Sequence, residues 1–199
     1  MYIFPDKHFI LASGSPRRKE LMAMLNVNFD VNTSIKVDES IPDGVVSRAE
    51  DIPVYLSQIK SEPYRNILQP DDVLITADTV VILGNEVIGK PTDAIHARQI
   101  LAQLSGRIHK VVTGVTVATP DNDSFSFSET TYVEFSDLSD DEIKYYVNQY
   151  APLDKAGAYG IQEWIGAAAV KGINGSFYNV MGLPVNRLYR ELKQRLSIH

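Results

Sequence analysis

The feature that most constrains the fold is the apolar run V-L-I-T-A-D-T-V-V-I-L at residues 73–83. A nearly continuous apolar segment of this length is typical of a strand that is covered on both faces. The Gly84-Asn85 pair that follows predicts a tight turn into a second strand at residues 86–88. Other segments of the chain must therefore pack on both faces of this hairpin.

Asp78 interrupts the apolar run. A buried carboxylate is costly unless a cation, a metal ion or hydrogen-bond donors accompany it. The simpler interpretation is an aspartate at a bulge or strand end that pairs with a nearby lysine. We favour a functional role, because ionisable groups in such surroundings are concentrated at functional sites.

Residues 10–25 predict a strand, a turn of small residues and a helix. Ser15 suits the N-cap and Pro16 the first helical position. Arg17 and Arg18 then fall in the first turn, where the helix dipole disfavours cations by a few tenths of a kcal/mol each. Two arginines, free amides and the hydroxyls of Ser13 and Ser15 make an anion site. A solvated helix with its arginines in water explains this motif equally well.

The remaining segments mix helices and strands. Strands are predicted at residues 9–12, 29–31, 111–118, 125–135 and 167–170. Helices are predicted to open near Asp51, at a cap formed by Thr92, at a capping box that begins at Ser139, and at Pro184. Such a mixture predicts an α/β or α+β sheet protein.

Charge and composition exclude several classes. The formal net charge of −6 argues against a nucleic acid polymer as partner. An acidic chain with basic residues gathered in one motif instead indicates a small anionic ligand. With no cysteine, disulfides, thiol catalysis and thiolate metal sites are excluded. Neither a signal peptide nor a long apolar run is evident, so we expect a cytoplasmic protein without a membrane partner.

Two further motifs are weak alone. Residues 84–91 imitate a phosphate-binding P-loop, but Pro91 replaces the hydroxyl residue that would hold magnesium, so we reject it. On spacing alone, Lys90 is best interpreted as an exposed lysine. Glu39 lies in an acidic loop that is usually just solvated, although Glu39 and Asp78 together would suffice for one hard divalent cation. The glycine-rich residues 154–162 suit close approach of the backbone to a ligand.

Four blocks together resemble the Maf family of nucleoside triphosphate pyrophosphatases. They are residues 13–21, 77–81, 89–91 and 154–162, which follow the family's order and span nearly the whole chain. Each block alone is weak, but the four together are specific. The ending Gly-Ile-Gln resembles the subgroup that acts on dTTP and UTP. Glu163-Trp164 depart from the small residues frequent there, and Ser61-Glu62-Pro63 depart from the usual alanine-rich continuation after Lys60.

The resemblance implies one domain over residues 1–199. Its expected fold is mixed α/β, with an elongated, mostly antiparallel mixed sheet flanked by helices and a central cleft between two lobes, as in inosine-triphosphatase-like proteins. The implied activity is hydrolysis of dTTP and UTP to the monophosphate and pyrophosphate, a house-cleaning reaction that extends to modified pyrimidine nucleotides. The expected partner is the nucleoside triphosphate, and a homodimer is left open.

The resemblance also implies roles for individual residues. Asp78 would accept the proton of the attacking water and, with Glu39, would hold Mg²⁺ or Mn²⁺. The substrate would be bound by Ser13, Ser15, Arg17, Arg18, Lys60, Thr79, Lys90 and Gln162.

Two alternatives come from other classes of function. One is a non-enzymatic nucleotide-binding regulator of cell division, which would bind nucleotide and release no pyrophosphate. The other is a purine-directed hydrolase of the inosine-triphosphatase type, which a panel of substrates distinguishes.

Overall fold

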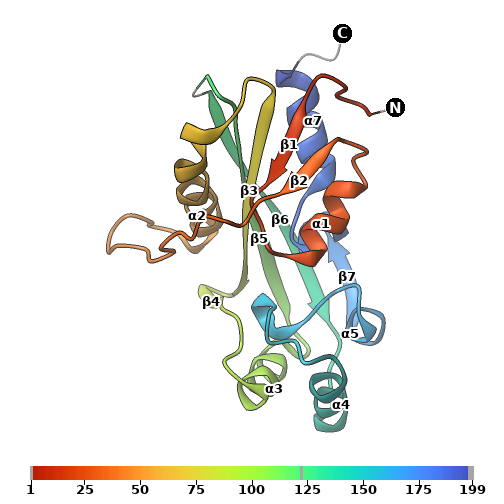
Figure 1. Ribbon diagram of the computed structural model, residues 1–199. Coiled ribbons are helices and arrows are strands. Elements are labelled where there is room, and N and C mark those ends of the chain that lie inside the picture. The colour runs from red at the N-terminus through yellow and green to blue at the C-terminus, as the bar shows by residue number, and fades with distance from the viewer. Residues whose placement is uncertain (1, 122, 197–199) are drawn as a thin grey trace. The chain divides into compact units, whose positions relative to one another are not determined.

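The computed structural model describes residues 2–121 and 123–196 (Figure 1). These residues form a seven-stranded sheet in the order β2-β1-β3-β5-β6-β7, with β4 paired to β3. The chain divides into two compact units. The first unit comprises the chain up to Asp78, Thr113–Glu129 and the chain from Gly182 onward, and the second unit comprises Thr79–Val112 and Thr130–Met181. The expected mixed α/β fold is confirmed.

Strand β3 (Asp72–Leu83) is the predicted apolar strand, and nearly all of its residues in the first unit are buried. In the first unit β1 (His8–Leu11) runs parallel to β3, with Phe9 opposite Val73. Strand β2 (Phe29–Val31) is parallel to β1 on its other side. In the second unit β4 (Glu86–Ile88) pairs antiparallel to β3. The predicted hairpin is therefore confirmed, and the sheet is mixed.

Helices α1 (Pro16–Ala23), α2 (Ile52–Ser61) and α7 (Val185–Arg195) belong to the first unit. The Ser15 hydroxyl accepts a hydrogen bond from the Arg18 amide, as an N-cap residue should. Helix α2 ends just before Pro63, where a 3₁₀ helix (Glu62–Ile67) follows. Leu188 and Leu192 give α7 a buried apolar stripe. The predicted cap at Ser15 and the predicted helix starts near Asp51 and Pro184 are therefore confirmed.

The second unit contains α3 (Ala94–Leu104), α4 (Asp140–Tyr150), α5 (Trp164–Ala168) and α6 (Phe177–Met181). The predicted capping box is present at the start of α4, where Ser139 and Glu142 bond each other's backbone amides. The predicted cap of α3 at Thr92 is wrong, because the Asp93 carboxylate accepts the His96 amide at 2.8 Å.

The predicted strand at residues 167–170 is also wrong. Residues 167 and 168 are the last two residues of α5, and β7 (Val170–Asn174) begins only at Val170. Alanine favours a helix over a strand, and the fully buried Ile165 fixes this helix in the core of the second unit. A short apolar run cannot be assigned from periodicity alone.

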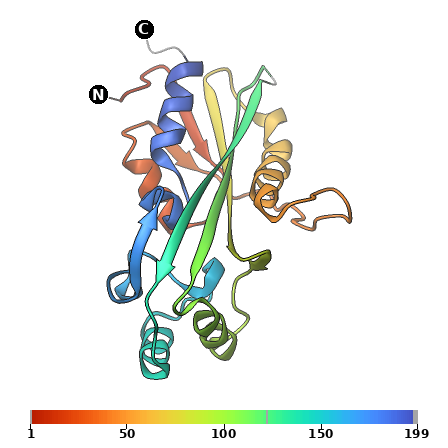
Figure 2. The ribbon, with the colours of Figure 1, turned by 180° about the vertical axis from the view of Figure 1, so that it is seen from behind.

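The two longest remaining strands are β5 (Ile108–Ala118) and β6 (Ser124–Phe135). They are neighbours in the sheet and run side by side (Figure 2). Strand β6 pairs antiparallel with β7 in the second unit, with Val133 opposite Ile173. Like β3, both strands pass from one unit to the other. Among residues 2–121 and 123–196, the helices are all too short or too polar to cross a membrane.

His109 is a fully buried ionisable residue of the second unit. Its Nε2 atom lies 2.8 Å from the Tyr159 hydroxyl, and its ring packs edge-on against Phe135. Burial lowers the pKa of His109 from 6.5 to about 4. The folded protein therefore holds this imidazole neutral at pH 7.

This histidine should make the fold less stable in acid. The unfolded chain takes up the proton near pH 6.5 and the folded chain only near pH 4, so stability is intact above pH 6.5 and falls as the pH decreases toward 4. Between pH 7 and pH 5 the free energy of unfolding should fall by about 2 kcal/mol from this residue. Urea unfolding of the wild type and of His109→Gln at both pH values measures the difference. An equal fall in the two proteins would contradict this assignment.

Candidate functional site

A lysine between two carboxylates is the centre of the candidate site in the first unit. The Lys60 Nζ atom lies 2.7 Å from Asp78 Oδ1 and 3.0 Å from Glu39 Oε2. The side chains of Lys60 and Asp78 are only 17% and 16% exposed, whereas that of Glu39 is 55% exposed. The carboxylate that interrupts the apolar strand therefore has a cation as its partner.

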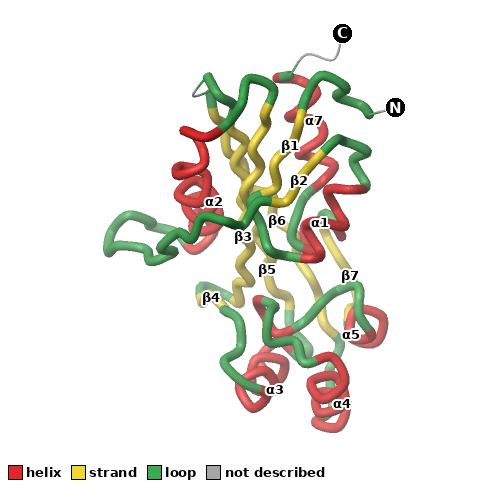
Figure 3. The backbone as a smooth tube through the Cα atoms, viewed as in Figure 1, coloured by secondary structure: helices red, strands yellow, loops and turns green. Residues whose placement is uncertain are grey.

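These three residues come from three different segments. Lys60 lies at the end of α2, Asp78 in β3, and Glu39 in the long loop at residues 32–48, drawn green between β2 and α2 in Figure 3. The sequence spacing alone did not predict that these three side chains lie together, because residues separated by 18 or more positions meet only through tertiary packing. Their convergence is a finding of the structure.

Polar and close backbone contacts fix α2 against the sheet in the first unit. The Thr76 hydroxyl donates to the Ser57 carbonyl at 2.6 Å, and the hydroxyls of Ser57 and Thr116 lie 2.8 Å apart. A Cβ atom on Gly114 would come within 2.2 Å of the Pro53 backbone, so only glycine fits there. Helix α2 is therefore held at its start and middle, which sets where the lysine at its end can reach.

Arg18 uses several of its hydrogen-bond donors on other groups of the protein. Its Nε donates to the Gly182 carbonyl at 2.8 Å. Its Nη1 donates to the Ala77 carbonyl at 2.9 Å and to the Ser13 hydroxyl at 3.3 Å. Burial lowers the pKa of Arg18, and the negative charge of Asp78 opposes that shift. Arginine stays charged even so, so Arg18 places a positive charge next to Asp78 while it ties the turn after β1 to β3.

A cavity of about 340 Å³ in the first unit adjoins this cluster. Four predicted site residues line it, namely Ser13, Arg18, Glu39 and Lys60. Ala12, Gly14 and Ala77, which belong to segments that the sequence pointed to, also line it. No sequence motif indicated the remaining lining residues, namely Thr33, Ile35, Lys36, Val37 and Tyr64. Cationic and apolar groups share this lining, which suits an anionic ligand that also carries an apolar part.

Tyr64 is a buried residue that sequence reasoning missed. Its hydroxyl donates to the Asn32 carbonyl at 3.1 Å and accepts from the Ile35 amide at 3.4 Å. It also packs with Leu74 in the core of the first unit. Tyr64 therefore anchors the beginning of the loop that carries Glu39, and no local motif around this tyrosine signals that role.

Ser15 and Arg17 lie at the start of α1, outside the described lining of this cavity. The Ser15 amide donates to the Ser13 hydroxyl at 3.3 Å, and the Ser15 hydroxyl accepts from the Arg18 amide at 3.4 Å. Both serine hydroxyls thus have partners within the turn. Arg17 is half-buried in the first turn of the helix.

The predicted site residues Thr79, Lys90 and Gln162 lie in the second unit. Lys90 and Gln162 are exposed, and Thr79 follows Asp78 directly in β3. The Gly157 amide donates to the Gly89 carbonyl at 3.1 Å, which ties the glycine-rich segment to the residue before Lys90. A Cβ atom on Gly157 would come within 2.9 Å of Val81, so this glycine is needed for packing within the protein.

The carboxylates of Asp78 and Glu39 form a donor set suited to a hard cation, because magnesium takes one or two carboxylates and keeps several waters. Both converge on the Lys60 ammonium, so the position that they share already accommodates a positive charge. Within the described parts of the chain, no cluster of three or more histidine or acidic side chains is placed to hold a metal.

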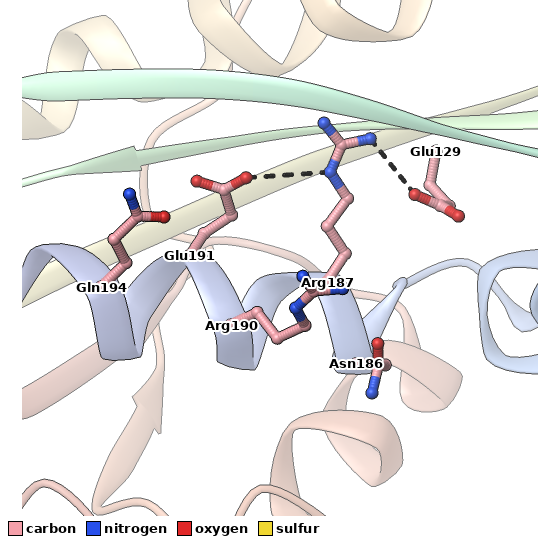
Figure 4. A pocket seen from close by; sticks show the side chains of 6 residues that line it. All are labelled: Glu129, Asn186, Arg187, Arg190, Glu191 and Gln194. Atoms are coloured by element: carbon pink, nitrogen blue, oxygen red, sulfur yellow. Dashed lines mark hydrogen bonds and ion pairs between the residues drawn. The ribbon is translucent and has the colours of Figure 1, made fainter.

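A second cavity of about 340 Å³ in the first unit lies beside α7 and β6 (Figure 4). Arg187 is 3.2 Å from Glu129 and 3.9 Å from Glu191, and its guanidinium lies 5.0 Å from the centre of the Phe127 ring. The lining of this cavity carries two arginines and two glutamates. Three cationic residues and one carboxylate line the cavity next to Lys60, which is therefore the better candidate for an anionic substrate.

Comparisons with known proteins agree with the sequence motifs. The family model described as Maf-like protein matches residues 8–195. A dTTP/UTP pyrophosphatase of Phocaeicola vulgatus is 52% identical over 185 residues, 93% of this chain and 94% of that protein. One from Bacteroides thetaiotaomicron is 52% identical over 190 residues, 95% and 97% of the two chains. A solved HAM1 protein from Coxiella burnetii aligns with 94% of this chain and 99% of its own, with a TM-score of 0.48 and 13% identity. On the family match and the two relatives that are 52% identical, the chain belongs to the Maf family.

Proposed function

We propose that this protein hydrolyses dTTP and UTP between the α- and β-phosphates, which gives the nucleoside monophosphate and pyrophosphate. The proposed substrates include modified pyrimidine nucleotides of the same shape. Membership of the Maf family and the names of its relatives support the reaction. The observation that carries the proposal is the Glu39–Lys60–Asp78 cluster beside a cavity lined by Ser13 and Arg18.

Asp78 is the proposed general base. Lys60 occupies its Oδ1 atom at 2.7 Å and thereby fixes the orientation of the carboxylate. The second oxygen accepts a proton from water, the resulting hydroxide attacks the α-phosphorus, and the bond to the bridging oxygen breaks. Pyrophosphate leaves with the electrons of that bond. Such a step depends mainly on positioning and on stabilisation of the charge on the phosphate oxygens.

The triphosphate is assigned to the basic residues and the turn after β1. Lys60 and Arg18 place two positive charges near Asp78. Arg17, Lys90 and the hydroxyls of Ser13 and Ser15 are the further proposed ligands. The hydrogen bonds from Arg18 to the carbonyls of Ala77 and Gly182 hold its guanidinium in place, so little side-chain freedom is lost on binding.

We assign Mg²⁺ or Mn²⁺ to the carboxylates of Asp78 and Glu39. The ion, when bound, polarises the phosphate and neutralises its developing charge. Glu39 is the more exposed of the two ligands and lies in a loop without regular structure. The Lys60 Nζ atom lies within 3.0 Å of an oxygen of each of these carboxylates.

Asp78→Asn tests the base and the metal ligand together. The variant keeps the shape of the side chain but removes its charge and basicity, so turnover should fall by about 10²–10⁴-fold. Mn²⁺ titration followed by electron paramagnetic resonance should show weaker binding. Asp141→Asn, at an exposed carboxylate paired with Lys144, is the matched control and should change neither. Retention of more than about a tenth of the activity in a folded variant would exclude Asp78 as the base.

Gln162 is proposed to select the base. Its amide offers one donor and one acceptor. Uracil and thymine present a carbonyl beside an N–H, which one amide matches with two hydrogen bonds. Cytosine presents an amino group beside an unprotonated nitrogen and fits the same orientation poorly. Thr79 and Arg17 are the other residues assigned to selectivity.

The substrate preference tests this assignment and the proposed function. The wild type should release pyrophosphate from UTP and dTTP with a kcat/KM well above that for GTP or ATP. Gln162→Glu removes the donor and adds a charge, so the UTP to GTP ratio should fall by at least tenfold. Gln103→Glu, at an exposed position of α3, should leave the ratio unchanged.

Three results would count against these assignments. If the ratio stays constant in Gln162→Glu, that side chain does not contact the base. A wild-type preference for GTP would favour the purine-directed alternative. Binding of nucleotide without release of pyrophosphate would favour the regulator.

A further inference from the structure

A second lysine between two carboxylates lies in the second unit, within the glycine-rich segment. The Lys155 Nζ atom is 2.8 Å from Asp154 Oδ1 and 3.2 Å from Glu163 Oε1. The side chains of Lys155 and Glu163 are only 9% and 18% exposed. The proposed reaction gives this buried ion pair no role.

A tyrosine from α4 completes the cluster. The Tyr146 hydroxyl donates to Glu163 Oε2 and accepts from the Gly160 amide at 3.0 Å. Burial and the bond to Glu163 both raise the pKa of Tyr146, so the phenol keeps its proton and remains a donor near neutral pH. Both oxygens of the Glu163 carboxylate are therefore engaged, one by a lysine and one by a tyrosine.

Close packing also restricts the side chain of Glu163. A Cβ atom on Gly160 would come within 2.8 Å of the Glu163 carboxylate. The Glu163 amide donates to the Gly160 carbonyl at 3.0 Å, which closes a tight turn over two residues, Ile161 and Gln162. Ile161 is buried and Gln162 is exposed. The backbone of Gln162 is thus fixed on both sides, while its side chain faces outward.

A buried ion pair is weak evidence for a contribution to stability, because desolvation of the two charges offsets much of their attraction. Such a pair can instead select one conformation of the segment that carries it, since every alternative leaves a buried charge without a partner. Here the selected conformation is the turn that presents Gln162. A recognition group held in this way loses little freedom when ligand binds.

We propose that Glu163 is a positioning residue for base selectivity, which holds the Gln162 turn through Lys155 and Tyr146 without contact with the nucleotide. This inference rests on the proposed function, in which Gln162 reads the base. It predicts that selectivity depends on the carboxylate of Glu163 only as long as Gln162 is present.

The test measures the ratio of kcat/KM for UTP to that for GTP in Glu163→Gln and Tyr146→Phe, each alone and combined with Gln162→Ala. Glu163→Gln keeps the shape of the side chain but removes the ion pair with Lys155. Tyr146→Phe removes one hydroxyl, so it carries the test should Glu163→Gln fail to fold. Glu134→Gln, which loses an exposed ion pair with Lys171 in the same unit, is the matched control.

Each single variant should lower the ratio by about tenfold or more, since displacement of a recognition group by about 1 Å can cost up to 10²-fold. In the Gln162→Ala background neither variant should lower it further, because residues that act through one another are not additive. Inhibition by the product pyrophosphate should stay unchanged, because pyrophosphate lacks a base. Glu134→Gln should behave as wild type.

Two kinds of failure are distinguishable. An unchanged ratio in Gln162→Ala would refute the reading of the base by Gln162, and with it this inference. A lower ratio in Gln162→Ala with unchanged ratios in both Glu163→Gln and Tyr146→Phe would overturn the positioning role alone. A further, additive loss in the double variants would overturn it as well, since Glu163 would then act independently of Gln162.

Discussion

The ion pair between Lys60 and Asp78 is the interaction on which the candidate site depends. The residues that precede Asp78 in β3 are buried, so its charge is tolerable only with a partner. The Lys60 ammonium provides that partner at 2.7 Å. That contact requires α2 to pack closely on the sheet, which the absence of a side chain at Gly114 permits. The same packing that stabilises the first unit thus orients the proposed base.

The protein uses the same electrostatic arrangement twice, with different consequences. Lys60 lies between Asp78 and Glu39, and the 55% exposed Glu39 side chain leaves this cluster accessible to a ligand. Lys155 lies between Asp154 and Glu163, and a buried tyrosine engages the remaining oxygen of Glu163. The cluster around Lys60 is suited to exchange of ionic partners during a reaction. The cluster around Lys155 is suited to hold one conformation of the backbone at Gln162.

Local signals explain what the sequence could predict. The hairpin of β3, the cap at Ser15 and the capping box at Ser139 depend on residues close in sequence, so all three were predicted correctly. The contact between Lys60 and Asp78 and the anchor at Tyr64 depend on segments that meet only after folding. No spacing predicted either contact, and the family resemblance supplied the role of Lys60. The short run at residues 167–170 was assigned wrongly because an apolar run of that length suits a helix as well as a strand.

Attack of water at the α-phosphorus is central to the proposed mechanism, and isotope labelling tests it most directly. UTP should be hydrolysed in ¹⁸O-enriched water and both products analysed by mass spectrometry, under conditions in which neither exchanges oxygen. Attack at the α-phosphorus predicts one ¹⁸O atom in the UMP and none in the pyrophosphate. Label in the pyrophosphate, or release of labelled orthophosphate, would contradict the account.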